Sequence, residues 1–175
     1  MHLLKQLLFC FFLFAGGCLF AQELTGWTKL KSPTNETLRR LYFVDANNGW
    51  AVSLGGKIIN TTDSGNNWNI QNSTVSTPIV DIFFINPNRG WALTYPSEPP
   101  FGTSILKTTD GGERWVKDSV FFQNEIFSTI FFVDDNVGFI GGNGIKKTTD
   151  GGLTWTSAFI EPGGVSTLPI NKFSF

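Results

Sequence analysis

The sequence is poor in the side chains that most catalytic and metal sites use. Its only histidine, His2, and both of its cysteines, Cys10 and Cys18, fall within the first 21 residues. If that segment is removed as a leader, the mature chain has neither residue type. Histidine general bases, thiol nucleophiles, most zinc sites and disulfides are then excluded. We therefore expect no metal, no cofactor and no enzymatic activity.

An excess of positive charge is also missing. The chain has 13 Lys and Arg residues against 14 Asp and Glu residues, and loss of the leader removes one of the lysines. Because nucleic-acid-binding proteins usually carry a basic patch, we expect no DNA or RNA partner. After the leader, no stretch has the spacing of apolar residues that is typical of a helix.

Residues 1–21 have the layout of a secretory signal peptide. Lys5 supplies the positive start, Leu7 to Phe14 form the apolar stretch, and Ala21 is a small residue before the cut. We predict a signal helix here and export to the periplasm, the cell surface or the medium. The end of the leader, Phe-Ala-Gln, is of a bacterial type.

Two other interpretations of the leader lead to a membrane. A spanning anchor is disfavoured because the apolar run is short and Gly16 and Gly17 interrupt it. A lipid anchor at Cys18 stays open as an alternative, because small residues precede it, although the usual leucine three residues earlier is lacking. The signal peptide and this possible anchor are the only membrane contacts we expect.

The sequence does contain one short string in three copies. A pair of hydroxyl residues, an aspartate, a glycine two residues on and a tryptophan three residues later recur at Thr61–Trp68, Thr108–Trp115 and Thr148–Trp155. We name these the Thr-Thr-Asp turns. A second motif, here named the marker turn, is rich in Asn and Asp, ends in Gly and an aromatic residue, and precedes each copy, at Val44–Trp50, Ile85–Trp91 and Val133–Phe139. Self-similarity at about forty residues indicates a repeat architecture.

Each repeat divides into four short runs of β-branched and aromatic residues, separated by clusters of Gly, Asn and Asp. Four-stranded units of about forty residues match the blade of a β-propeller. We predict an all-β fold, a partial β-propeller over residues 22–175. Its blades are expected at about residues 37–74, 77–122 and 126–161.

Both ends of the chain resemble parts of further blades. Trp27 has the spacing of the last strand of a preceding unit, and Ser166–Phe175 resembles Ser76–Phe84, the first strand of the second unit. A partial fourth blade is therefore expected from residue 166. Because propellers need about four to eight blades to close, we expect a fragment of a longer protein. A short protein that closes by oligomerising is the alternative.

The aspartate, glycine and tryptophan of each Thr-Thr-Asp turn are predicted to be structural. Asp can accept backbone hydrogen bonds in a turn, Gly permits a positive φ, and Trp fills space between blades. A calcium or sugar ligand is the alternative, but one carboxylate per turn is too few for a good calcium site. The nine residues are Asp63, Gly65, Trp68, Asp110, Gly112, Trp115, Asp150, Gly152 and Trp155.

Two further sets of residues are candidates for binding a partner. Arg40, Asp81 and Thr129 occupy equivalent polar positions in the first strands, which line the channel of a propeller. We hypothesise that they form a polar site there, with solvated strand ends as the alternative. The stretch Tyr95 to Thr103 lengthens the second repeat, and the aromatic rings of Tyr95 and Phe101 on a proline-rich loop suit contact with a partner. A plain hairpin extension is the alternative.

The Thr-Thr-Asp turns resemble the Asp-box (BNR) repeat of sialidases and of some large-propeller glycosidases. This resemblance makes a portion of a glycoside hydrolase an alternative function. It does not carry over a sialidase site, which needs an arginine triad and a tyrosine nucleophile with a glutamate partner. Arg89 lies in a marker turn and Arg114 in a Thr-Thr-Asp turn, which are poor places for a central pocket.

A closer resemblance is to the photosystem II assembly and stability factor family. In that family Gly-Trp-Ala precedes Thr-Thr-Asp-Gly-Gly-x-x-Trp, as Asn48–Val52 precedes Asn60–Trp68 here. The resemblance implies an exported, non-enzymatic propeller that binds a protein partner. We expect a protein-binding or assembly module, with a cell-surface carbohydrate binder as a third possibility.

Overall fold

The structure is a computed structural model of the chain, and it describes residues 29–158 and Lys172. The fold below is that of the compact unit to which residues 31–158 belong. The expected signal helix, Trp27 and the partial fourth blade lie outside the described residues, apart from Lys172. Within the described residues, no helix is long and apolar enough to cross a membrane.

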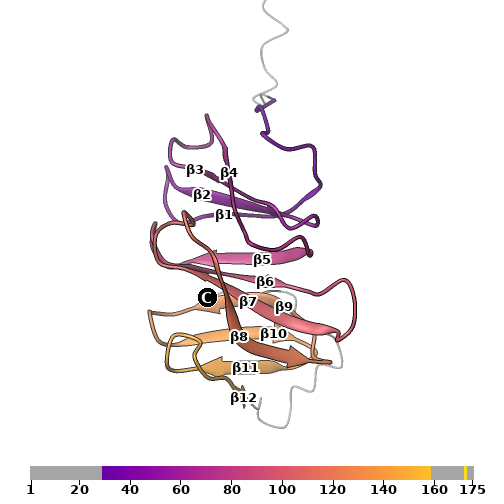
Figure 1. The fold of residues 1–175 in the computed structure, drawn as a ribbon. Helices are drawn as coiled ribbons and strands as arrows, with labels where there is room; N and C mark the ends of the chain where they lie inside the picture. The colour runs from indigo at the N-terminus through magenta and orange to yellow at the C-terminus, as the bar shows by residue number, and fades with distance from the viewer. Residues whose placement is uncertain (1–28, 159–171, 173–175) are drawn as a thin grey trace, which may run out of the picture. The chain divides into compact units, whose positions relative to one another are not determined.

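Residues 38–158 form three antiparallel four-stranded sheets, in each of which the strands follow one another in sequence order (Figure 1). The first blade contains β1 (Leu38–Phe43), β2 (Gly49–Ser53), β3 (Ile58–Thr61) and β4 (Asn69–Gln71). The second contains β5 (Ile79–Phe84), β6 (Gly90–Thr94), β7 (Gly102–Thr108) and β8 (Val116–Gln123). The third contains β9 (Phe127–Phe132), β10 (Gly138–Gly142), β11 (Ile145–Thr148) and β12 (Thr156–Ala158). The predicted all-β, partial β-propeller fold is confirmed.

The second repeat differs from the expectation at its insertion. The loop was expected to run from Tyr95 to Thr103, but Gly102 and Thr103 belong to β7, where they pair with Gln123 and Phe122 of β8. The loop is therefore limited to residues 95–101. The extra residues on both sides of the hairpin pair with each other, so that β7 and β8 are longer than the outer strands of the other blades.

Neighbouring blades are joined by a stacked pair of aromatic rings. Trp50 of β2 lies on Phe84 of β5, with ring centroids 3.6 Å apart and planes 9° apart. Trp91 of β6 lies on Phe132 of β9 in the same way, at 3.7 Å and 10°. All four side chains are buried. Each marker-turn tryptophan thus covers the end of the next blade's first strand, as expected of packing residues.

Hydrogen bonds reinforce this packing and also run from one blade to the next. The Trp50 indole N–H donates to the Gly111 carbonyl at 3.1 Å, and the Tyr42 hydroxyl donates to the Phe84 carbonyl at 2.8 Å. Lys107 of the second blade donates to the Gly152 carbonyl of the third at 2.8 Å. The first strands β1, β5 and β9 are neighbours in space, and they position the candidate site described next.

Candidate functional site

The three Thr-Thr-Asp turns share one hydrogen-bond pattern. In the first, the Thr61 hydroxyl donates to Asp63 Oδ1 at 2.8 Å and accepts from the Gly65 N–H at 2.9 Å. Asp63 Oδ1 also accepts from the Asn67 N–H at 2.8 Å. The same three bonds recur in the second turn among Thr108, Gly112, Asp110 and Arg114, and in the third among Thr148, Gly152, Asp150 and Thr154.

The glycines of these turns adopt the conformation that the motif predicts. Gly65, Gly112 and Gly152 have φ values of 87°, 92° and 87°. The residue before each also has a positive φ, and in the first turn that residue is Ser64, at 63°. An L-residue such as serine occupies this region only at some energetic cost, so the first turn is the most strained of the three.

Hydrogen bonds favour the charged form of the turn aspartates. Hydrogen bonds to a carboxylate favour its charged form and so lower its pKa. The pKa of each turn aspartate lies below its ordinary value, chiefly through the Asn67 backbone for Asp63, the Thr108 hydroxyl for Asp110 and the Thr154 hydroxyl for Asp150.

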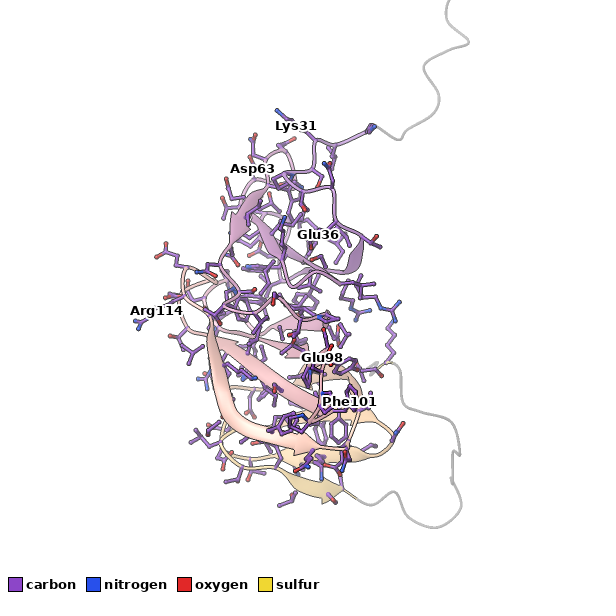
Figure 2. All side chains as sticks on the ribbon, turned by 45° about the vertical axis from the view of Figure 1, so that its right-hand side comes forward. Lys31, Glu36, Asp63, Glu98, Phe101 and Arg114 are labelled. Atoms are coloured by element: carbon purple, nitrogen blue, oxygen red, sulfur yellow. The ribbon has the colours of Figure 1, made fainter. Side chains whose placement is uncertain are left out.

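The Thr-Thr-Asp turn and the marker turn of each blade lie against each other. The Ser64 N–H donates to the Asn47 carbonyl at 3.1 Å in the first blade. The Gly111 and Gly151 N–H groups bond to the Asn88 and Asn136 carbonyls at 2.8 and 2.9 Å in the other two. Both kinds of turn therefore form one edge of the propeller, here named the turn edge. In Figure 2, Asp63 and Arg114 project from it at the left.

The turn tryptophans are packing residues with a polar contact at their N–H. Trp115 is fully buried, whereas Trp68 and Trp155 are half-buried. The indole N–H groups of Trp68 and Trp155 donate to Gly65 and Gly152 of their own turns at 3.0 and 3.2 Å. That of Trp115 instead reaches Gln71 of the first blade, at 3.2 Å.

The structure brings Arg40, Asp81 and Thr129 together, and we name these three residues the inner-strand cluster. The Arg40 Nε lies 2.9 Å from Asp81 Oδ1, and Asp81 Oδ2 accepts from the Ile130 N–H at 2.9 Å. The Thr129 hydroxyl also bonds to Asp81. One carboxylate thus joins the first strands of all three blades.

Burial decides which member of the cluster a partner could reach. Asp81 and Thr129 are each only 3% exposed, so their contacts lie between blades. The side chain of Arg40 is 41% exposed. Burial raises the pKa of Asp81, although the hydrogen bond from Ile130 and the charge of Arg40 act in the opposite direction. The site hypothesis therefore rests on Arg40 alone, and its binding role stays a prediction.

A β-bulge places each of these polar side chains. The register of β1 shifts between Leu38 and Arg40, and that of β5 shifts between Ile79 and Asp81. In β9 the pairing with β10 skips from Phe127 to Thr129. A bulge inserts one unpaired residue and re-aims the side chains around it, and bulges are frequent beside functional sites. The sequence signal, one polar residue within an apolar run, marked the position but not the bulge.

The insertion loop presents one exposed aromatic ring, not the two that were expected. The Tyr95 hydroxyl donates to the Phe127 carbonyl of the third blade at 2.6 Å. Burial raises the pKa of Tyr95 to about 12. Phe101, at the other end of the loop, is 53% exposed. Tyr95 therefore anchors the loop, whereas the ring of Phe101, which Figure 2 shows near Glu98, is exposed to solvent.

The sequence did not reveal the charged contacts between the second and third blades. Arg89 Nη1 lies 3.1 Å from Asp135 Oδ1, and the guanidinium also lies over the Trp91 ring at 5.3 Å. Lys107 pairs with Asp118 of its own blade in addition to the Gly152 carbonyl of the next. Lys107 directly precedes the hydroxyl pair of its repeat, and this position was the one sequence signal for its contact with the next blade.

Comparison with known proteins supports the fold. No protein-family model matches the sequence, and no curated protein matches it. Among solved structures, YCF48 bound to D1 peptide is 24% identical with a TM-score of 0.65, covering 78% of this chain and 44% of that one. YCF48 from Cyanidioschyzon merolae is 20% identical with a TM-score of 0.63, covering 75% and 42%.

An ancestral GH74 enzyme is also similar, with 20% identity, a TM-score of 0.61 and coverage of 77% of this chain and 20% of that one. The chain thus spans less than half the length of the YCF48 structures it matches. At these identities the likeness concerns the fold. The described part of the chain is a partial β-propeller similar to those of YCF48 and GH74 enzymes.

Proposed function

We propose that the chain is an exported protein-binding or assembly module without enzymatic activity, and that it belongs to a longer β-propeller. The observation that carries the proposal is the likeness of its fold to YCF48 bound to D1 peptide. A propeller of this kind binds a segment of another protein. The order of the marker and Thr-Thr-Asp turns supports the same comparison.

Arg39 and Arg40 of β1 are the residues that we expect to contact the partner. Arg39 is exposed, and its positive charge acts on the Tyr95 hydroxyl. Arg40 uses its Nε for Asp81, and its side chain stays 41% exposed. A guanidinium is a planar fork with five N–H donors, so one edge can hold an internal carboxylate while another binds a partner. The two arginines and Phe101 therefore give the partner charged and apolar contacts.

A glycoside hydrolase remains the second candidate, because GH74 enzymes share the fold. Such enzymes usually need two carboxyl groups that flank one bond, one of them with a raised pKa. The aspartates of the Thr-Thr-Asp turns have lowered pKa values and are used by the turns. Asp81 has a raised pKa, but it is buried and bonded on both oxygens. These uses of the carboxylates support a non-enzymatic role.

The binding proposal can be tested by capture from an envelope extract of the encoding organism. Arg39→Gln and Phe101→Ser remove exposed contacts and leave the inner-strand cluster intact. Arg114→Gln, on the turn edge, is the matched control. We expect recovery of a specific partner to fall about tenfold or more with the two binding-surface variants and to stay unchanged with Arg114→Gln. Equal recovery with all variants would remove these residues from the proposal.

Activity and export have separate tests. Incubation with xyloglucan should release no new reducing ends, and release that Asp81→Asn abolishes would favour the hydrolase. Export predicts a mature N-terminus at Gln22, read by mass spectrometry of the secreted protein. A lipid-modified N-terminus at Cys18 would favour the lipoprotein alternative.

A further inference from the structure

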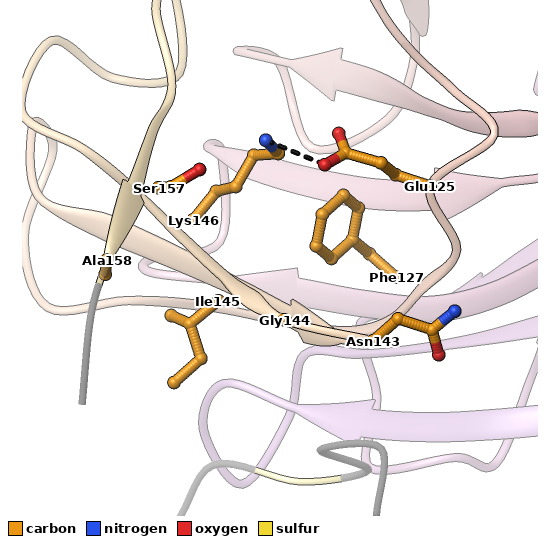
Figure 3. Close-up of a pocket in the computed structure, with 8 residues that line it drawn as sticks. All are labelled: Glu125, Phe127, Asn143, Gly144, Ile145, Lys146, Ser157 and Ala158. Carbon is orange, nitrogen blue, oxygen red and sulfur yellow. Dashed lines mark ion pairs between the residues drawn. The ribbon is translucent and has the colours of Figure 1, made fainter. Parts of the chain in front are cut away.

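A small pocket opens at the edge opposite the turn edge, where the β8–β9 and β10–β11 turns meet (Figure 3). Its volume is about 170 Å³, below the 300–1,000 Å³ of typical small-molecule sites. It therefore suits one side chain or a terminal group. Its wall includes Glu125, Phe127, Gly144, Lys146 and Ser157.

Lys146 is the cation of this pocket, and two aromatic rings hold it in place. Its Nζ lies 5.8 Å from the centroid of the Phe122 ring and 5.9 Å from that of Phe127. Rings at this distance attract an ammonium group through their negative faces. The side chain of Lys146 is only 15% exposed. The ammonium group is therefore fixed, partly desolvated and turned toward the pocket.

Glu125 is the ion-pair partner of this ammonium group. Its Oε1 lies 3.0 Å from the Lys146 Nζ, as the dashed line in Figure 3 shows. The Glu125 side chain is 45% exposed, three times as much as that of Lys146. Because solvent reaches the Glu125 end of this ion pair and screens it, Glu125 can leave at little cost. Lysine has three N–H donors, and one pairing does not use them all.

The rim of the pocket continues into the insertion loop. The Asn124 N–H donates to the Phe101 carbonyl at 2.9 Å, and the Thr103 hydroxyl donates to the Glu125 carbonyl at 2.9 Å. The backbone at Phe101 is thus bonded to Asn124, the neighbour in sequence of Glu125, which pairs with Lys146. An apolar contact and a cationic one lie on the same edge of the molecule.

We propose that this pocket binds a carboxylate of an extended peptide segment, which replaces Glu125 on Lys146 while a neighbouring apolar side chain packs on Phe101. This inference rests on the proposed function as a protein-binding module and names the chemistry of one contact. A carboxylate fits better than a cation, because the group that cannot move is the ammonium. A cation would have to pair with Glu125, which Lys146 already neutralises.

N-Acetyl-L-phenylalanine is a suitable probe, because it combines a carboxylate with an aromatic ring, and its amide derivative is the uncharged control. Titration of the full chain, followed by NMR of the backbone amides of Gly144 and Ser157, should give saturable shifts with the acid alone. Lys146→Met, which keeps the aliphatic packing, should abolish them. Glu125→Gln should tighten binding by about two- to fivefold, because it removes the internal competitor.

Lys147→Met is the matched control, since it makes the same change at the next residue, whose side chain lies over Phe139 on the opposite face of the sheet. It should leave the titration unchanged. Shifts that persist in Lys146→Met, or that the amide reproduces, would overturn the assignment. The probe needs no protein partner, so a negative titration would refute only the proposal about this pocket. Loss of the proposed function would instead show in the capture experiment.

Discussion

Two substitutions of Asp81 should separate the contribution of its hydrogen bond to stability from the contribution of its charge. Asp81→Asn keeps an oxygen for the Ile130 N–H but loses the ion pair with Arg40. That pair is worth at most about 1 kcal/mol, because the Arg40 side chain is 41% exposed. Asp81→Leu leaves the buried Ile130 N–H without its acceptor, at a further cost of about 1–3 kcal/mol. We expect the leucine variant to be the less stable by that difference.

Urea unfolding followed by tryptophan fluorescence measures both variants. Asp135→Leu is the control, since Asp135 also pairs with an arginine of the neighbouring blade, but with a side chain that is 58% exposed. Its effect should stay within about 1 kcal/mol. If Asp81→Asn and Asp81→Leu cost the same free energy of unfolding, the bond to Ile130 is not what Asp81 contributes.

The same variants test the pKa of Asp81. Burial raises its folded-state pKa above the ordinary 3.8, so its contribution to stability is fully present below that pH and is lost as the pH rises through the raised value. Asparagine does not titrate. The stability of Asp81→Asn relative to the original chain should therefore improve as the pH rises from about 4 through the raised pKa of Asp81. If the difference in stability between the two proteins stays constant with pH, or changes in the opposite direction, then Arg40 lowers the pKa of Asp81 at least as much as burial raises it.

Three further predictions concern the turns. Thr108→Val removes a buried hydroxyl that donates to the turn aspartate and accepts from a glycine N–H. It should lower the free energy of unfolding in urea by about 1–3 kcal/mol. The control Thr109→Val, at the exposed neighbour, should lower it by less than about 0.5 kcal/mol. Gly112→Ala should destabilise the fold by on the order of 2 kcal/mol, because φ is +92° and the new Cβ would lie 2.1 Å from the Gln71 Oε1. In the control Gly144→Ala the new Cβ meets nothing within 4 Å, so this variant should be near neutral in the same assay. The turn aspartates have lowered pKa values, so their contribution should be lost as the pH falls below about 4, as thermal unfolding against pH can show.

Local features of the molecule could be predicted from the sequence, because they depend on neighbours in the chain. The positive φ of Gly65 follows from its place in a tight turn. The strands follow from runs such as Ile82–Ile85, which are bounded by turn residues.

Contacts between blades could not be predicted, because they depend on where each side chain lies after the sheets pack. Asp81 was expected to face a channel, but a bulge turns it toward Ile130 of the next blade. Tyr95 was expected to project from a loop, but its hydroxyl bonds to Phe127. Lys146 gave no signal at all, since two phenylalanines distant in sequence decide its surroundings.

The bulges in the first strands limit how the repeat can change in length. Side chains of a strand alternate between its two faces, so losing one residue exchanges the faces for everything on one side of the deletion. Deleting Ile82, which pairs with Ala92, would exchange the faces in this way, whereas Val80, which the pairing of β5 skips, could be lost with Asp81 still opposite Leu93. The loop at residues 95–101 carries no such constraint on parity, so a repeat of this type can lengthen there by any number of residues.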